Sequence, residues 1–366
     1  MKFPICLALA AVLTSFSSGA FAAETTDKGV SAKGSGIPSV KIGEVVGPID
    51  AGGDSHYFLY VPKSLKEGRK APLLHFNGSG GGSAASLSRY IAGAETNGWI
   101  VVANVESRNE QSTEQDHQYA KNVVTHAIGS LPVDPARVYF AGNSGGGAMS
   151  FYNASRIPSI GAMPEIGYIP KDTQVPDGHY FVINGTNDFN RYTSANAVAS
   201  IGGKAIQRFF VGGHDDAPDW LCAEGMAWLN GKYLAGKKQD KNHTAECLDY
   251  EISMLRWIDS LEKDAPHRAY YWCLFLRDDY GISGSNAEAL SPITARLALK
   301  PGCAAYVKGI AAISGFSGTY YAPLGRNSRT KHITPEIESA AKKLEGEYSG
   351  VPMIEELARA LGKPTV

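Results

Sequence analysis

Hydrophobic positions divide the chain into two regions with different periods. Between about residues 38 and 220, short runs rich in β-branched and aromatic residues alternate with stretches of helical spacing. This alternation is typical of a mainly parallel β-sheet covered by helices on both faces. It predicts strands at residues 40–46, 57–61, 72–76, 100–105, 137–141, 163–168, 180–184 and 205–211.

Helices are predicted between the strands wherever apolar residues recur every three or four positions. Leu87, Tyr90 and Ala94 have this spacing. Ser112, followed three residues later by Gln115, is typical of the capped start of a further helix. At least two connections between strands are therefore predicted to be helical.

The strand signals stop after Trp220, and helical spacing continues from there to residue 366. Thr334 and Pro335 have the residue types of a helix N-cap and first helical position. One apolar stripe in this region consists of Leu248, Ile252, Leu255, Ile258 and Leu261. We therefore expect an α/β domain at residues 38–220 and a helical domain at residues 221–366.

The first 22 residues are typical of an export signal. Lys2 supplies a positive charge, residues 5–12 are apolar, and Ala20-Phe21-Ala22 offers a small-x-small cleavage pattern. Residues 23–37 are rich in Gly, Ser, Lys and Thr without an apolar period, which predicts a flexible mature N-terminus. The expected location is secreted or periplasmic.

Composition excludes several classes of protein. The chain has 366 residues, 43% of them hydrophobic, which is enough for a full core and too many for a disordered or fibrous protein. Its 35 Lys and Arg residues against 36 Asp and Glu residues give a formal net charge of −1, without the positive excess of nucleic-acid binders. No segment after the leader is long and apolar enough to span a bilayer. We expect no nucleic-acid partner and no stable membrane insertion.

Cysteines suggest a structural role. Cleavage of the leader removes Cys6 and leaves Cys222, Cys247, Cys273 and Cys303, an even number in an oxidising compartment. Sequential pairing into two disulfides is one expectation, and four free buried thiols is the other. The spacing contains no Cys-x-x-Cys pair and no histidine at ligand intervals, so a zinc site is not expected.

The most specific chemical signal is Gly142-Asn143-Ser144-Gly145-Gly146, directly after the fifth predicted strand and before a helix-compatible run. A serine on such a sharp strand-to-helix turn needs small neighbours, because larger side chains collide with the adjoining elements. This pattern predicts Ser144 as a nucleophile rather than as part of a glycine-rich turn without chemistry.

Serine is a weak nucleophile, so it needs a histidine base, and that histidine needs an acidic partner. Asp188 follows the seventh predicted strand and His214 follows the eighth, which gives the order Ser, acid, His. The competing acids are Glu165 within the sixth strand and the pair at positions 215 and 216, which flank the base too closely in sequence. His75 precedes the nucleophile, so we assign it to packing or substrate contact.

Acyl transfer also requires hydrogen-bond donors directed at the developing oxyanion. The N–H of Gly145 is one candidate, and the N–H of Ser79, in the glycine-rich loop at residues 77–82, is the other. This loop lacks the Gly-Lys-Ser/Thr ending of a phosphate-binding loop. No metal or organic cofactor is expected.

These motifs resemble those of the α/β-hydrolase superfamily, and more narrowly those of exported esterases similar to polyhydroxyalkanoate depolymerases and feruloyl or acetyl-xylan esterases. The resemblance covers about residues 40–220 and includes the segment at 133–139 before the nucleophile and the acid loop at 185–188. It implies an α/β-hydrolase fold of about eight mostly parallel strands. Those esterases usually have His-Gly at the oxyanion turn, where this chain has Asn77-Gly78.

Together these observations predict an exported serine hydrolase that cleaves small-molecule or polymeric carboxylic esters through an acyl-enzyme. A serine peptidase or amidase would use the same triad, and a non-catalytic binding protein on this scaffold is a further alternative. About ten residues separate the sixth and seventh predicted strands, which leaves no room for a cap domain. We expect the helical region to lead away from the catalytic edge.

Overall fold

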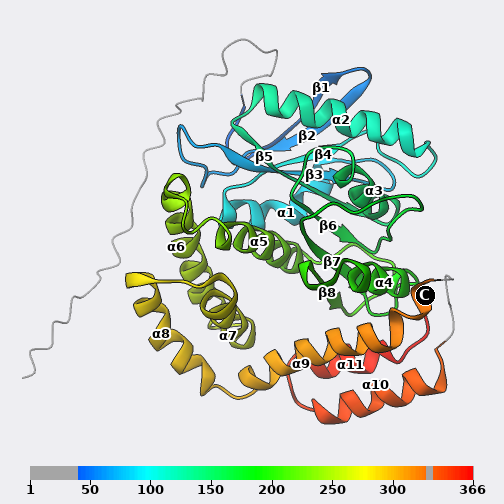
Figure 1. Cartoon of the computed structure of the whole chain (residues 1–366), viewed down its shortest axis with the longest axis vertical. Coiled ribbons are helices and arrows are strands. Elements are labelled where there is room, and N and C mark those ends of the chain that lie inside the picture. Colours follow the sequence, from blue (N-terminus) through cyan, green and yellow to red (C-terminus); the bar gives the residue numbers. More distant parts are fainter. Residues whose placement is uncertain (1–39, 327–332, 366) are drawn as a thin grey trace, which may run out of the picture.

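The computed structural model describes residues 40–326 and 333–365. Within them one sheet has the strand order β1-β2-β4-β3-β5-β6-β7-β8 (Figure 1). The pairings β1–β2 and β2–β4 are antiparallel, and all pairings from β3 to β8 are parallel. The strands are β1 Val45–Gly52, β2 Ser55–Tyr60, β3 Ala71–Asn77, β4 Ile100–Asn104, β5 Val133–Asn143, β6 Gly161–Glu165, β7 His179–Gly185 and β8 Ala205–Phe210. This is the α/β-hydrolase fold, as predicted.

Helices connect the parallel strands and continue beyond the sheet. Those between strands are α1 Ala84–Asn97, α2 Thr113–Ser130, α3 Gly145–Ala154 and α4 Arg191–Ile201. After β8 come α5 Asp219–Ala235, α6 Thr244–Leu261, α7 Pro266–Leu274, α8 Gly284–Ala298, α9 Cys303–Phe316, α10 Pro335–Glu347 and α11 Ile354–Leu361.

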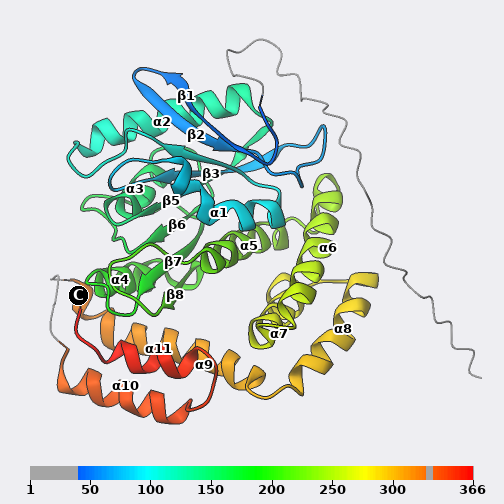
Figure 2. The ribbon, with the colours of Figure 1, turned by 180° about the vertical axis from the view of Figure 1, so that it is seen from behind.

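The helices form a layer on each face of the sheet, as Figures 1 and 2 show from opposite sides. The apolar side chains of α2, α3 and α4 pack on one face, around Val102 and Phe140. Those of α1 and α5 pack on the other face, around Phe76 and Tyr139. The sheet therefore presents the carboxyl ends of its parallel strands along one edge, where loops after different strands meet.

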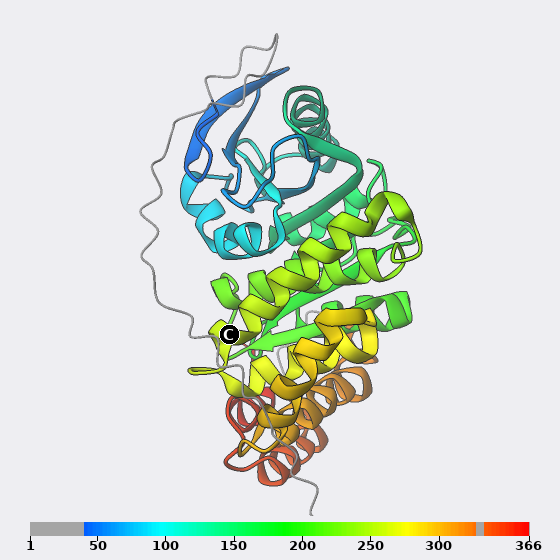
Figure 3. The same cartoon turned by 90° about the vertical axis from the view of Figure 1, so that its left-hand side faces the viewer.

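Helices after β8 extend this core, and α9–α11 lie at the end of the molecule opposite to β1 (Figure 3). The cluster under α1 and α5 continues into α6, α7 and α8, so apolar packing crosses residue 220. A separate cluster joins α9, α10 and α11 to Tyr192 of α4 and Phe209 of β8. The division into domains at residue 220 stays a prediction.

All of the predicted strands are present in the described residues, although β6 ends at Glu165 rather than at residue 168 and the first strand is displaced. It begins at Val45 rather than at residue 40, because the chain turns just before it. Gly43 has a φ of +80° and donates its N–H to the Val61 carbonyl at 2.7 Å. A positive φ suits glycine and interrupts extended backbone, so the apolar run at 40–46 does not begin a strand at its first residue.

The predicted helix caps are present. Ser112 Oγ accepts from the Gln115 N–H at 3.2 Å, and Thr334 Oγ1 accepts from the Ile337 N–H at 3.3 Å. The predicted apolar stripe of α6 is confirmed in part: Ile258 is fully buried and Leu255 and Leu261 pack against the core, whereas Leu248 is 47% exposed. The buried residues of α6 are Cys247, Tyr250, Glu251, Met254 and Ile258.

The expected disulfides are absent from the described residues, where Cys222, Cys247, Cys273 and Cys303 are free and buried. Cys222 Sγ lies 3.8 Å from a carboxylate oxygen of Glu165, and Cys247 Sγ lies 3.9 Å from the Leu234 carbonyl. Burial raises the pKa of all four thiols, which holds them protonated. The alternative of four buried thiols therefore describes this structure.

Two further expectations concern the ends of the chain and the membrane. The export signal at 1–22 and the flexible segment at 23–37 lie outside the described residues. Among the helices of the described ranges, none has the length and apolar character needed to cross a bilayer.

Candidate active site

Ser144 stands on a sharp turn between β5 and α3. Its φ of 54° and ψ of −117° are unusual for a residue with a side chain, and such strain persists only where the surroundings impose it. Here the N–H of Ser144 donates to the Glu165 carbonyl at 3.0 Å, and its own carbonyl accepts from the Ala148 N–H at 3.1 Å. The turn is therefore fixed from β6 on one side and from α3 on the other.

The glycines around Ser144 are required by close backbone contacts. A Cβ atom on Gly142 would lie 2.4 Å from the Gly146 carbonyl oxygen, and one on Gly146 would lie 2.0 Å from the Asn77 carbonyl oxygen. Both distances are far below van der Waals contact, and both obstacles are main chain. The pattern at 142–146 thus has the steric cause that the sequence predicts.

Asp188 is fully buried in the loop after β7. Its Oδ1 accepts from the Asn190 N–H at 2.9 Å, and its Oδ2 accepts from Asn184 Nδ2 at 2.8 Å. Asn184 is on β7 itself, so the strand positions the carboxylate directly. Both oxygens of this buried carboxylate are therefore hydrogen-bonded.

His214 joins the acid to the nucleophile. Its Nδ1 lies 2.8 Å from Asp188 Oδ1, and its Nε2 lies 2.7 Å from Ser144 Oγ. The ring of Phe189 stacks on the imidazole with centroids 4.1 Å apart. The three residues predicted from the sequence are therefore brought together with the connectivity of a serine–histidine–carboxylate triad.

The competing acids have other partners. Glu165 Oε2 accepts from Arg89 Nη1 at 2.6 Å, and its Oε1 accepts from the Tyr90 hydroxyl. Asp215 accepts from the Gly213 N–H at 2.9 Å, within its own loop. Asp216 faces Arg89 at 3.5 Å. None of the three carboxylates is hydrogen-bonded to His214 in the described residues.

The predicted oxyanion donors differ in their availability. Gly145 is the first residue of α3, and its N–H has no partner in the described chain. The N–H of Ser79, in contrast, donates to Asn143 Oδ1 at 3.1 Å. The sequence did not predict this bond, because it depends on the side chain of the residue before the nucleophile. In this structure the Ser79 N–H is committed to Asn143.

Asn143, the last residue of β5, belongs to a polar chain that links several elements at the catalytic edge. Its Nδ2 donates to Asp216 Oδ1 at 2.6 Å, and Asp216 faces Arg89 of α1, which pairs with Glu165. Ser79 is the other end of this chain. The loops after β3 and β8 are thereby held to the carboxyl ends of β5 and β6. A buried glutamate at the end of a strand is the one sequence signal that could have indicated a charged partner nearby.

Residues after α11 also reach the catalytic edge. The guanidinium of the fully buried Arg191 donates to the carbonyls of Thr186 and Lys363, the latter at 2.9 Å. The expectation that the helical region only leads away from this edge is therefore wrong in part. Helices α6–α8 do lead away, whereas α9–α11 return along α4 because their apolar faces pack there (Figure 1).

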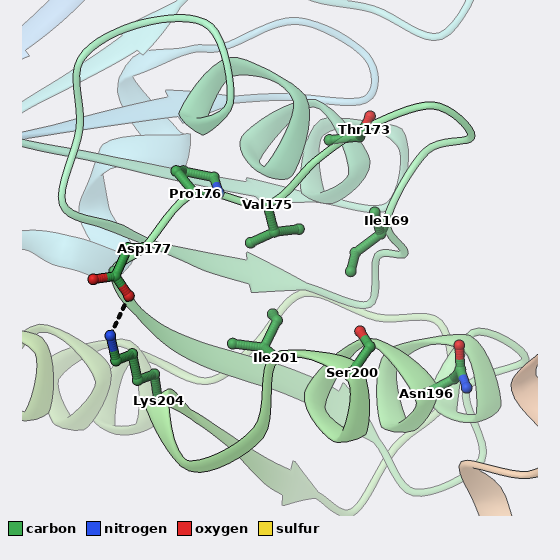
Figure 4. A pocket seen from close by; sticks show the side chains of 10 residues that line it. Ile169, Thr173, Val175, Pro176, Asp177, Asn196, Ser200, Ile201 and Lys204 are labelled. Carbon is green, nitrogen blue, oxygen red and sulfur yellow. Dashed lines mark hydrogen bonds and ion pairs between the residues drawn. The ribbon is translucent and has the colours of Figure 1, made fainter.

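Two cavities found among the described residues lie away from the triad. Figure 4 shows one of about 590 Å³ between the β6–β7 connection and the end of α4. Ile169, Val175 and Ile201 give it apolar walls, and the Asp177–Lys204 ion pair closes one side. A second cavity of about 350 Å³ lies between α7 and α8. The triad lines neither of them, and the described part of the chain contains no cluster of three or more His, Cys, Asp or Glu side chains suited to a metal ion.

Comparison with known proteins gave no matching family model and no curated relative. Similar solved structures include a thermostable esterase, 20% identical over 48% of this chain and 58% of its own length, with a TM-score of 0.40. An arylesterase is 12% identical over 53% of this chain and 87% of its own, with a TM-score of 0.42. A hyperthermophilic esterase from Pyrobaculum calidifontis is 15% identical over 43% and 70%, with a TM-score of 0.36. The fold assignment rests on the strand order of the sheet.

Proposed function

We propose that this chain is a serine hydrolase that cleaves carboxylic esters through an acyl-enzyme on Ser144. The observation that carries the proposal is the unbroken hydrogen-bonded chain from Ser144 Oγ through His214 to the buried Asp188. A hydroxyl in contact with an imidazole, whose other nitrogen faces a buried carboxylate, is activated for attack on a carbonyl carbon. The strained backbone of Ser144 further supports a functional role for this residue.

The reaction follows from these contacts. Ser144 Oγ forms a bond to the carbonyl carbon, its proton moves to His214 Nε2, and the carbonyl π electrons move to oxygen. When the tetrahedral intermediate collapses, the alcohol oxygen takes the proton from Nε2 and leaves. Water then attacks the acyl-enzyme, with His214 as base, and releases the acid and free Ser144. Asp188 stabilises the imidazolium in both halves.

Esters are proposed ahead of amides because the motifs at 142–146 and 185–188 resemble those of exported esterases. Small-molecule and polymeric esters are both candidates. A peptidase or amidase with the same triad is the alternative, and a binding protein is less well supported because all three catalytic groups are in contact.

The test combines covalent labelling with a substrate panel. A fluorophosphonate probe should label the wild-type chain and not the Ser144→Ala variant. Hydrolysis of p-nitrophenyl esters should exceed that of peptide anilides. Loss of Ser144 or His214 should lower kcat by up to about 10⁶-fold, and Asp188→Asn by about 10⁴-fold through the wrong tautomer. Ser260→Ala, an exposed serine on α6, is the matched control. Normal turnover by folded Ser144→Ala protein would contradict the proposal.

We further propose that the protein is exported and acts in a secreted or periplasmic location. The pattern at residues 1–22 supports this. Sequencing of the protein recovered from its native host should give an N-terminus at Ala23, and recovery of the chain with Met1 intact would contradict export.

A further inference from the structure

Asn109 lies in the loop after β4 and contacts both segments from which oxyanion donors are expected. Its main-chain N–H donates to the Ser79 carbonyl at 2.9 Å. Its side-chain amide lies against Gly145, because a Cβ atom on that glycine would be 1.8 Å from Asn109 Oδ1. The carboxamide therefore occupies the space beside the residue that follows the nucleophile.

The carboxamide of Asn109 is free to bind a ligand. The residue is exposed, and its side chain makes no hydrogen bond within the described residues. The same Cβ position on Gly145 would be 3.5 Å from Asn109 Nδ2. A half-turn of the amide exchanges the positions of Oδ1 and Nδ2, which places an N–H donor where an acceptor now lies. After that rotation an N–H donor of Asn109 lies beside Gly145, whose own N–H is free.

The second donor predicted from the sequence is occupied. Sites of this kind direct two donors at the oxyanion, and the N–H of Ser79 is already bound to Asn143 Oδ1 at 3.1 Å. That bond is itself supported, because Asn143 Nδ2 donates to Asp216 at 2.6 Å. Release of the Ser79 N–H would break a connected network rather than one contact.

We propose that the side-chain Nδ2–H of Asn109 donates the second hydrogen bond to the oxyanion, beside the N–H of Gly145. This inference rests on the proposed function. As Ser144 Oγ bonds to the carbonyl carbon and its proton passes to His214 Nε2, negative charge develops on the carbonyl oxygen. Asn109 and Gly145 stabilise that charge, and it returns to the carbonyl when the alcohol leaves. Gly145 is then a glycine because any side chain there would displace the Asn109 amide.

The test compares Asn109→Ala, which removes the amide, with Asn109→Asp, which puts acceptors in its place. For p-nitrophenyl acetate, Asn109→Ala should lower kcat by about 10²- to 10³-fold, the usual effect of removing an oxyanion donor, with KM changed little. Asn109→Asp should lose more, because a carboxylate repels the oxyanion. The affinity of a trifluoromethyl ketone, which binds as a hemiketal anion, should weaken by the same factor as kcat falls.

Controls separate this inference from the function on which it rests. Glu110→Ala changes an exposed residue of the same loop and should leave kcat unaltered. Equal kcat for Asn109→Ala and wild type, or a change in KM alone, would overturn the assignment of Asn109. The proposed function would still stand in that case if Ser144→Ala remained inactive, and it would fall if Ser144→Ala kept its activity.

Discussion

The side-chain amide of Asn187 donates a hydrogen bond to the main-chain carbonyl of Pro364 over 3.1 Å, although 177 residues separate them. Asn187 immediately precedes the triad carboxylate Asp188. The segment after α11 therefore contacts the loop that positions the acid. Arg191 donates to the same segment, at the Lys363 carbonyl.

Deletion of residues 363–366 should consequently lower activity before it unfolds the protein. The deletion removes the carbonyl acceptors of Asn187 and of the buried Arg191, and an unpaired buried donor costs about 1–3 kcal/mol. We expect kcat/KM for p-nitrophenyl acetate to fall several-fold at 25 °C, and activity to be lost on heating below the unfolding temperature. Lys363→Ala retains the main-chain carbonyl and is the control. A truncated protein with wild-type kcat/KM at all temperatures would show that this segment does not support the acid loop.

Glu165→Gln tests which carboxylate serves His214. Gln can accept from Arg89 with its oxygen and donate its Nε2–H to the Tyr90 hydroxyl, so the variant removes charge while it preserves shape. Because Glu165 does not contact His214, kcat at pH 8 should fall by less than about tenfold, whereas Asp188→Asn should cost about 10⁴-fold. Steady-state kinetics on both folded variants provide the measurement. A loss of the order of 10⁴ for Glu165→Gln would make it the catalytic acid in place of Asp188.

The triad could be predicted from the sequence because each member has a local signal: the turn glycines around Ser144, and strand ends before Asp188 and His214. Each of these signals reflects a local backbone conformation, and a few neighbouring residues are enough to determine it. The strands were predicted for the same reason, apart from the start of β1, where a turn at Gly43 interrupts the apolar run, and the end of β6, where Ile166 has a φ of +44°.

Features that depend on side chains from distant elements could not be predicted in this way. The hydrogen bond from the Ser79 N–H requires one particular rotamer of Asn143. That rotamer is held by the hydrogen bond from Asn143 Nδ2 to Asp216. The return of α9–α11 to α4 depends on which apolar faces meet, not on their period. The exposure of Leu248 likewise follows from the rotation of α6 about its own axis.

Arg137 anchors the helices after β8 to the sheet. Its side chain is 1% exposed and lies at the start of the buried part of β5. The guanidinium donates to Asn230 of α5 at 2.6 Å and forms an ion pair with Glu246 of α6. It also lies 4.4 Å from the ring centre of Tyr233. Arg137→Met should lower the free energy of unfolding by about 1–3 kcal/mol, because it leaves the buried Asn230 Oδ1 without its donor.

Guanidinium chloride unfolding of the Arg137 variant would measure this loss. Arg277→Met is the control, since the Arg277–Asp278 ion pair is more than half exposed and should contribute less than about 1 kcal/mol. Equal effects of the two substitutions would show that Arg137 is not an anchor.

His75 should make the folded protein sensitive to acid. It is fully buried on β3, and neither ring nitrogen has a partner among the described residues. Burial lowers the pKa of His75 from 6.5 to about 3, so between these pH values the unfolded chain binds a proton that the folded chain does not. The stability due to neutral His75 is therefore complete above pH 6.5 and is lost as the pH falls, by at most about 1.4 kcal/mol per pH unit.

His75→Leu removes this proton and should remove its contribution to the pH dependence. At pH 7 the substitution should be close to neutral, because it replaces unpaired buried nitrogens with an apolar side chain of similar size. At pH 4.5 the variant should be more stable than the wild type by up to about 3 kcal/mol, which is two pH units of protonation. Burial raises the pKa of Asp116 to about 6, which acts in the opposite direction, but it is common to both proteins and cancels in their difference. Urea unfolding of both proteins at the two pH values measures their free energies of unfolding. If the difference between the two free energies stayed constant with pH, His75 would take up its proton in the folded state as readily as in the unfolded chain.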